Sequence, residues 1–436
     1  MPMIITIIDK EGVLQSLKKD YEWSELGRAK QFLIQRFQVY AEMVFSGVLG
    51  KELPKKIELW LVDDWESENR SRAGAFIFDE SKERMLVFEI NKITLKHAIV
   101  TPYSRVSSGV ILHEMLHAAD YLTLKKYYKM SDKLEVDGWH FHVDSGDIEI
   151  ICDYRYFALL AVLKLLNYYR AEGVAKLGEH LLTYMEFDDF DSTDQALDAF
   201  SRRFEATMHE AQRIIKEQRS FDDGFESPIY DGAQILLLKV LGKKGDVDEE
   251  LEQRVLKGLE TGHYEMTKDE AMSIVRAALL LSLEDYIYSL LQLDDEITPV
   301  HEFFETWALS QNDEDKNHVE IFMEFLRHPQ TVDSFIDYMQ QIVGGCTSEE
   351  NLDVNYAVFC KNLPKPENNP GLKEKVDALY LVLKNDESFE KRQIAHWALT
   401  YFFYHRDVIH DDLEVFGLFD DMMVIDRALK AIEFNP

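Results

Sequence analysis

The sequence has few cysteines and few basic side chains, and each shortage argues against a class of protein. Of its 436 residues only Cys152, Cys346 and Cys360 are cysteines, and no two of them form a Cys-x-x-Cys pair. We therefore expect no disulfide framework and a reducing compartment, which we interpret as the cytoplasm. No basic stretch precedes the short apolar run near the start of the chain, so we expect no secretory signal peptide.

Long hydrophobic runs are also missing. The longest, "YFALLAVLKLL" at residues 156–166, is interrupted by Lys164 and is shorter than the roughly 20 residues that cross a bilayer. Because 80 acidic residues face only 48 basic ones, the formal net charge is −32, which repels phosphate backbones and anionic membranes. We expect neither nucleic acid nor a membrane as partner. A content of 26 Phe, 20 Tyr and 6 Trp is too high for a disordered chain.

Hydrophobic periodicity predicts a mixed first part and a helical remainder. Residues 25–45 have helical spacing, whereas "KKIELWLV" (55–62), "AGAFIFD" (73–79) and "RMLVFEIN" (84–91) are typical of strands. From Asp147 onward the pattern is helical almost throughout, with a linker-like "CKNLPKPENNPG" near residue 363. We predict an α+β domain at 1–170, a large all-α helical region at 171–363, and a C-terminal helical segment at 364–436.

The segment "GVILHEMLHAAD" (109–120) predicts a metal site. On a helix, His113 and His117 lie on one face one turn apart, so both imidazoles can bind one cation. Zinc lowers the pKa of a bound water towards about 7, and Glu114 is close enough to take the proton of that water. Such a pattern also arises by chance in helices. Here, however, Asp120 continues the same polar stripe on an otherwise apolar helix, which packing alone does not explain.

The order of the motifs resembles the SprT/Spartan-like zinc metallopeptidase domain. The resemblance covers about residues 25–150 and rests on "VFSGVLGKELPKKIELWLV", "RAGAFIF", "MLVFEIN" and "VILHEMLHAAD". It implies a zincin-like fold, Zn²⁺ bound by His113 and His117, Glu114 as general base, and hydrolysis of peptide bonds.

The family pattern adds a third histidine, for which "VDGWHFHVDSGDIEIICD" offers candidates. His142 is our first choice because it directly precedes a predicted helix start, and His140 is the second. Glu149 is a rival, since "EIICD" has the E-xxx-D form of the zincins that use a glutamate ligand. In that form Asp153 would support a ligand histidine from one turn away, and we assign Asp120 a similar supporting role.

The tail, residues 401–432, partly resembles a small helical domain of unknown function. The shared acidic, apolar and glycine positions are Asp407, Ile409, Asp411, Gly417, Asp420 and Asp421, while His405 and His410 replace the two prolines of that pattern. Helix capping by the aspartates explains the pattern more simply than a cation site does.

The sequence thus predicts a zinc-dependent metalloendopeptidase acting on a protein or peptide, with an acidic helical region that selects or restrains substrates. A basic protein substrate fits the net charge, whereas the action of Spartan-like relatives on DNA-bound proteins does not. In zincins the substrate pairs with an edge strand, for which "RMLVFEIN" is the candidate. The alternative is a helical scaffold or interaction protein that binds zinc without catalysis or cuts only when triggered.

Overall fold

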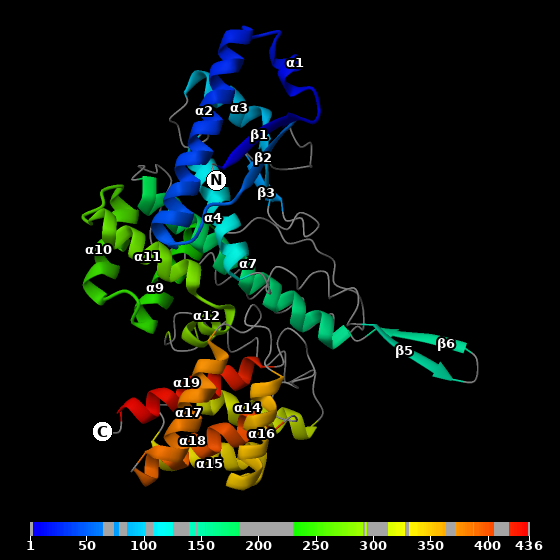
Figure 1. The fold of residues 1–436 in the computed structure, drawn as a ribbon, viewed down its shortest axis with the longest axis vertical. Coiled ribbons are helices and arrows are strands. Elements are labelled where there is room, and N and C mark those ends of the chain that lie inside the picture. The colour runs from blue at the N-terminus through cyan, green and yellow to red at the C-terminus, as the bar shows by residue number, and fades with distance from the viewer. Residues whose placement is uncertain are drawn as a thin grey trace. The chain divides into compact units, whose positions relative to one another are not determined.

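The computed structural model describes residues 3–63, 74–77, 85–101, 108–124, 139–144, 147–152, 154–183, 230–290, 293, 313–327, 331–362, 371–386, 388–404 and 418–434 (Figure 1). Contacts divide the chain into two compact units. Unit 1 comprises residues 1–123, 169–199 and 228–281, and unit 2 comprises 124–168, 200–227 and 282–436. The predicted domain limits near residues 170 and 363 stay a prediction. Among the described helices, none has the length and apolarity needed to span a bilayer.

Unit 1 contains a four-stranded mixed sheet in the order β1-β2-β4-β3. Strands β1 (Ile4–Asp9), β2 (Lys56–Val62) and β4 (Met85–Asn91) are parallel neighbours, and β3 (Gly74–Ile77) pairs antiparallel with β4. The three predicted strands are confirmed. Strand β1 was not predicted from the sequence. In the structure its burial alternates only partly along the strand, and Ile4 is exposed, so the usual alternation of a strand is weak here.

The prediction that "RMLVFEIN" forms the edge strand is wrong. This segment is β4, which pairs with β2 on one side and with β3 on the other. Its residues Leu86, Val87, Phe88 and Ile90 are buried, so both faces of the strand are covered, as is common for an inner strand. The short strand β3 lies outside it and forms the edge of the sheet as far as the described residues show.

Helices of unit 1 cover the sheet. The predicted helix at 25–45 is confirmed as α2 (Trp23–Ala41), which continues into the π-helix η1 (Glu42–Val48). Its buried residues recur at helical spacing, because one apolar stripe faces the sheet and the helices α3 (Lys92–Val100) and α4 (Val110–Thr123). The other helices described in this unit are the short α1 (Val13–Leu17), α9 (Tyr230–Lys244), α10 (Glu249–Thr261), α11 (Lys268–Leu280) and the second half of α7 (Tyr154–Thr183).

Two glycines let α7 approach its neighbours in unit 1. A Cβ atom at Gly178 would lie 2.6 Å from Leu116 Cδ1 on α4, and a Cβ at Gly173 would lie 2.6 Å from the backbone oxygen of Ala233 on α9. The contact at Gly173 is with backbone, which yields less easily than the end of a leucine side chain. Glycine at these positions therefore sets how closely α7 packs against α4 and α9.

Unit 2 opens with a hairpin that the sequence did not predict. Strands β5 (Trp139–Asp144) and β6 (Asp147–Cys152) pair antiparallel, with His142 opposite Glu149 in the register. The predicted helix start before Asp147 is therefore wrong, and α7 begins only at Tyr154. The three isoleucines of "DIEIIC" are β-branched and favour an extended backbone over a helix.

The other described residues of unit 2 are mostly helical, as predicted for this part of the chain. Its described helices are α12 (Leu283–Leu290), α14 (Asp313–Arg327), α15 (Val332–Val343), α16 (Glu349–Lys361), α17 (Leu372–Asn385), α18 (Phe389–Phe402) and α19 (Phe419–Phe434). Helix α18 contacts α15, α16, α17 and α19 and buries most of its residues, so it forms the centre of this bundle. Over both units the described residues are mostly helical, with the two small sheets.

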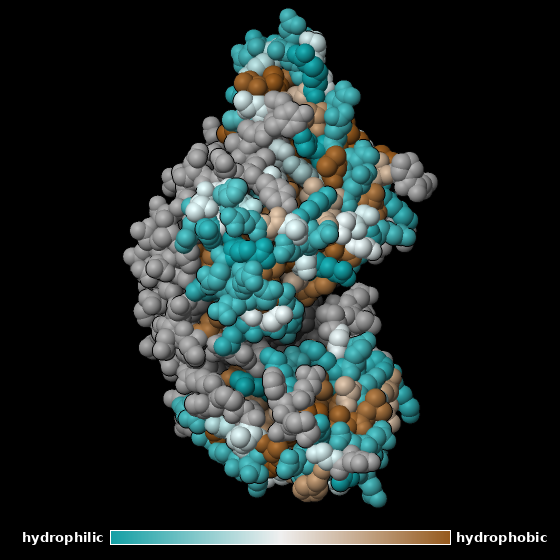
Figure 2. Space-filling view, turned by 90° about the vertical axis from the view of Figure 1, so that its left-hand side faces the viewer, coloured by the Kyte–Doolittle hydropathy of each residue, from teal (hydrophilic) through white to brown (hydrophobic). Residues whose placement is uncertain are grey.

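Of the tail residues with a family resemblance, only two lie among the described residues. Asp420 and Asp421 are both fully buried, and the hydroxyl group of Tyr401 donates a hydrogen bond of 2.6 Å to Asp420. The other tail positions named above, including His405 and His410, lie outside the described residues. On the face drawn in Figure 2, hydrophilic side chains dominate among the coloured residues, in keeping with the excess of acidic groups.

We expect Gly173→Ala to destabilise the protein by about 1–3 kcal/mol, because the added methyl group meets the backbone of Ala233. The matched control is Gly27→Ala on α2, where a Cβ has no heavy atom within 4 Å. It should stabilise the helix by about 0.5–1 kcal/mol. Denaturant unfolding of both variants measures the difference, and equal effects would contradict the close approach of α7 and α9.

Candidate metal centre

Helix α4 presents a polar stripe on an apolar helix, as predicted. Its residues Ile111, Leu112, Met115, Leu116, Ala118 and Ala119 are fully buried. His113 and His117 are partly exposed, with 14% and 15% of their side-chain surface accessible. Asp120 completes the stripe and is fully buried. The helix therefore holds the two imidazoles side by side while the apolar residues anchor it in the core of unit 1.

A second polar stripe lies opposite, on α7. Arg170 donates two hydrogen bonds to Asp120, of 2.9 Å and 2.7 Å, and both side chains are completely buried. Glu172, Lys176 and Glu179 follow on α7 at a spacing that repeats one helix face, and all three are buried. Buried charges of this kind require partners. Arg170 and Glu172 of α7 face Asp120 and His113 of α4, whereas Lys176 pairs with Glu179 within α7.

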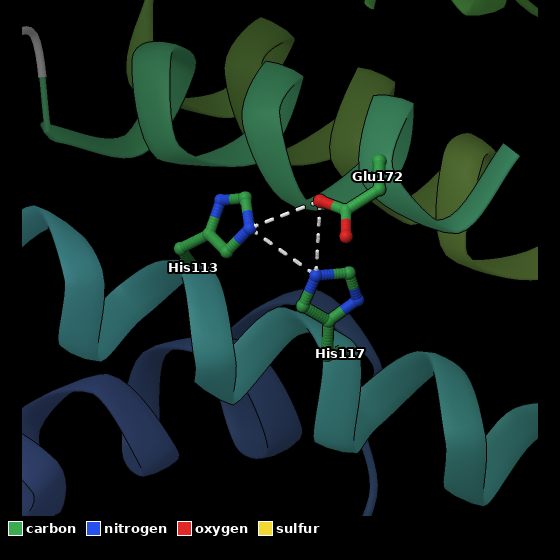
Figure 3. A group of neighbouring side chains, drawn as sticks. All are labelled: His113, His117 and Glu172. Carbon is green, nitrogen blue, oxygen red and sulfur yellow. Dashed lines mark hydrogen bonds and ion pairs between the residues drawn. The ribbon is translucent and has the colours of Figure 1, made fainter. Parts of the chain in front are cut away.

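Three donor atoms from these stripes form a near-equilateral triangle (Figure 3). His113 Nε2 lies 3.2 Å from His117 Nε2, and Glu172 Oε2 lies 3.2 Å and 3.3 Å from these two nitrogens. Ligands at 2.0–2.1 Å from a tetrahedral zinc ion are about 3.3–3.4 Å apart, since the edge of a tetrahedron is about 1.6 times its radius. The three atoms therefore have the spacing of one face of a zinc coordination sphere.

The direction of the groups supports the same interpretation. Although Glu172 Oε2 lies at contact distance from both imidazoles, it is buried and accepts no hydrogen bond of acceptable angle. A buried carboxylate oxygen without a hydrogen-bond donor is costly. This oxygen lies within 3.3 Å of two imidazole nitrogens that are themselves within hydrogen-bond distance of each other, an arrangement that a shared cation would stabilise.

Electrostatics already prepare the site for a cation. Burial lowers the pKa of His113, but the carboxylates of Glu172, Glu179 and Glu114 outweigh it and raise the pKa to about 10. Burial would raise the pKa of Glu172, whereas the two histidines hold it well below its usual range. With this pKa, His113 would be an imidazolium beside the Glu172 carboxylate at neutral pH, and a metal ion that bound there would displace its proton.

Glu114 points to the sheet rather than to α7. The backbone N–H of Phe76, on the edge strand β3, donates a hydrogen bond of 2.7 Å to the Glu114 carboxylate. The ring of Phe76 also contacts Phe88 on β4 and Tyr121 on α4, at centroid distances of 5.4 Å and 5.7 Å. A carboxylate that directly follows the candidate ligand His113 in sequence is thus held beside the edge of the sheet.

The structure brings together His113 and His117, as predicted, and adds a partner that sequence reasoning missed. Glu172 was overlooked because its segment was assigned only to a helical core. A signal was present, since charged residues recur at 172, 176 and 179, in the spacing that drew attention to α4.

The other predicted site residues stay predictions. His142, His140 and Glu149 belong to β5 and β6 of unit 2, and their side chains lie outside the described residues. Because Glu149 lies on a strand, however, "EIICD" does not form the helical turn that the E-xxx-D form requires. Asp153 is outside the described residues as well.

Asp120 has Arg170 as its partner, and the supporting role predicted for Asp120 towards a ligand histidine is still a prediction.

No family model, no curated protein and no solved structure matches the chain. The candidate metal site is therefore defined by its own side chains, His113, His117 and Glu172, and by the distances between them.

We expect the protein to bind one divalent transition-metal ion per chain and Glu172→Gln to weaken this binding roughly a hundredfold or more. The reason is that each ligand supplies several kcal/mol of the binding free energy. His142→Ala is the matched variant, because it removes the rival third ligand. Competition titration with a zinc-responsive dye measures both. Loss of affinity in His142→Ala with none in Glu172→Gln would overturn the assignment of Glu172.

Metal binding should release a proton, because the pKa of His113 is raised to about 10 in the metal-free protein and the bound form requires a neutral imidazole. The dissociation constant for the metal should therefore fall about tenfold for each unit by which the pH rises across the neutral range, where His113 is charged before binding. Calorimetric titration in buffers of different ionisation enthalpy counts the released protons. Binding without proton release would contradict a charged His113 as ligand in the metal-free protein.

Proposed function

We propose that the protein is a zinc-dependent metalloendopeptidase. The proposal depends above all on one observation, the 3.2–3.3 Å triangle of His113 Nε2 and His117 Nε2 on α4, the helix that also carries Glu114, with Glu172 Oε2 on α7. Three protein ligands and a partly exposed pair of histidines are typical of catalytic rather than closed structural zinc sites, which use four protein ligands.

The choice of hydrolysis over redox chemistry follows from Glu114. Two histidines and one carboxylate also suit the iron(II) of oxygenases, so the ligand set alone does not decide between the two classes. A hydrolase needs in addition a carboxylate that handles protons without binding the metal. Glu114 meets this need, because it comes directly after a ligand residue and is held by the Phe76 N–H outside the triangle.

The roles of the protein groups follow from their places. A zinc ion, when bound, supplies a water that is acidic at neutral pH and polarises the substrate carbonyl. Glu114 takes a proton from the attacking water and passes it to the leaving amine. His113, His117 and Glu172 orient the ion, while the apolar residues of α4 keep this helix fixed during the reaction.

An extended protein or peptide segment is the substrate that the sheet favours. Phe76 donates its N–H to Glu114, which does not belong to the sheet, so this N–H points away from β4. A peptide that pairs with this side of β3 would place its backbone beside Glu114. We therefore propose β3, rather than the predicted β4, as the edge strand that pairs with the substrate.

The resemblance to SprT/Spartan-like metallopeptidases agrees with this function and remains part of the proposal. The resembling segments correspond to η1, β2, β3, β4 and α4, and α4 contacts η1 and β3 directly. We further propose an intracellular protein with a basic protein as substrate, because a net charge of −32 attracts cationic partners and repels nucleic acid. The helical unit 2 would then select or restrain substrates.

The alternative is a scaffold that binds zinc without catalysis, and the hydrogen bond between Phe76 and Glu114 is the observation in its favour. A carboxylate held by the backbone is not available as a base until that bond is exchanged. The two functions differ in what Glu114 does once metal is bound.

We expect Glu114→Gln to keep bound zinc and to lower the rate of peptide cleavage by a factor on the order of 10²–10⁴, because it loses only the proton acceptor. Cleavage of an unfolded, lysine-rich protein and the zinc content of the purified variant are the two measurements. Glu249→Gln, an exposed position on α10, is the matched control and should change neither. Equal cleavage by wild type and Glu114→Gln would refute the enzymatic proposal, and zinc binding without any cleavage would leave the scaffold.

A further inference from the structure

His113 has a second ring nitrogen, and a buried carboxylate lies beside it. Nε2 belongs to the triangle of donors, whereas Nδ1 lies 3.4 Å from Glu179 Oε2. The two nitrogens are on different sides of the imidazole ring, so one carboxylate of α7 approaches each of them. Glu172 faces the side where the metal binds, and Glu179 faces the other.

Glu179 is held in place by burial and by charge. Its side chain is only 5% exposed, and its Oε2 atom lies 3.6 Å from Nζ of Lys176, which is equally buried. Because Lys176 lies three residues earlier on the same helix, this ion pair stays within α7. The positive charge of Lys176 compensates for the burial of the Glu179 side chain.

Glu179 follows Glu172 by seven positions, which is about two turns of α7, so both carboxylates project from one face of the helix towards α4. One helix thus supplies a candidate ligand and a second carboxylate at the back of another ligand. A metal-binding histidine commonly donates the hydrogen on its free nitrogen to a carboxylate, which fixes the orientation of the ring and makes the ligand more basic.

We propose that Glu179 is a positioning residue of the metal centre, and this inference rests on the proposed metal site. Glu179 accepts the Nδ1–H of His113, which leaves the lone pair of Nε2 directed at the ion. Glu179 itself does not bind the metal, because it faces the opposite side of the ring from the triangle of donors. Lys176 pairs with Glu179 from within the same helix.

Three variants separate this role from a merely structural one. Glu179→Leu removes the acceptor, and we expect zinc affinity to fall about 10–100-fold. Glu179→Gln keeps the shape and an acceptor oxygen but loses the charge, so its affinity should lie between that of wild type and that of the leucine variant. Lys176→Met breaks the same ion pair without touching the acceptor and should keep affinity within about threefold of wild type, which is under 1 kcal/mol.

The tautomer of His113 distinguishes the two roles of Glu179, because a purely structural role of Glu179 would leave this tautomer unchanged. In the zinc-loaded wild type, ¹⁵N shifts of the imidazole should show hydrogen on Nδ1 and metal at Nε2. In Glu179→Leu we expect a mixture of orientations or exchange of the ring, seen as broadening or loss of that Nδ1–H signal. Circular dichroism of each variant checks that the helices form.

Each of three possible results leads to a different conclusion about the metal site and Glu179. If wild type binds no zinc, the proposed metal site itself fails, whatever Glu179 does. If wild type binds zinc and both Glu179 variants keep its affinity and the His113 tautomer, the positioning role is overturned while the metal site stands. If Lys176→Met loses as much affinity as Glu179→Leu, the ion pair stabilises α7 and Glu179 has no separate role.

Discussion

The buried ion pair of Asp120 and Arg170 is the interaction on which the rest of the site depends. It joins α4 to α7 across 50 residues of sequence, and both side chains are completely excluded from solvent. Breaking such a pair by removing one partner typically costs about 3–5 kcal/mol, because the remaining charge is left buried. Asp120 lies three residues after His117, and Arg170 lies two residues before Glu172. The pair therefore fixes the register in which the carboxylate meets the imidazoles.

The same pairing explains why so many charged groups lie inside an otherwise apolar unit. Glu172 faces the two histidines, and Glu179 lies between Lys176 and His113. Close approach of the helices is made possible by Gly178 against Leu116, where any larger residue would meet a side chain of α4. Charge pairing thus selects one register, and the small residue permits the short distance that the donor atoms need.

Local sequence information predicted the part of the site that lies on one helix. His113 and His117 are one turn apart, so their proximity follows from helix geometry alone once α4 is assigned. Strands β2, β3 and β4 were also predicted, because alternation and β-branched residues are local signals. The order of the strands was not, since pairing depends on contacts across the sheet, and the sequence gives no sign that the four-residue β3 lies outside β4.

The position of Glu172 beside the histidines could not be predicted from a short stretch of sequence. Its proximity to the histidines arises from the packing of α4 and α7, which no spacing within a short window encodes. The hairpin of β5 and β6 shows another limit, because "DIEIICDYRYF" contains apolar residues at spacings that fit both a strand and a helix. The helical interpretation placed Glu149 and Asp153 one turn apart and so favoured the wrong local geometry.

X-ray absorption spectroscopy of the zinc-loaded protein is the decisive measurement of the metal site, because it reports the atoms around the ion without reference to activity. We expect four nitrogen or oxygen neighbours at about 2.0–2.1 Å, with the multiple-scattering pattern of two imidazoles and no sulfur. A single imidazole, a third imidazole in place of the carboxylate, or a sulfur neighbour at about 2.3 Å would contradict this expectation.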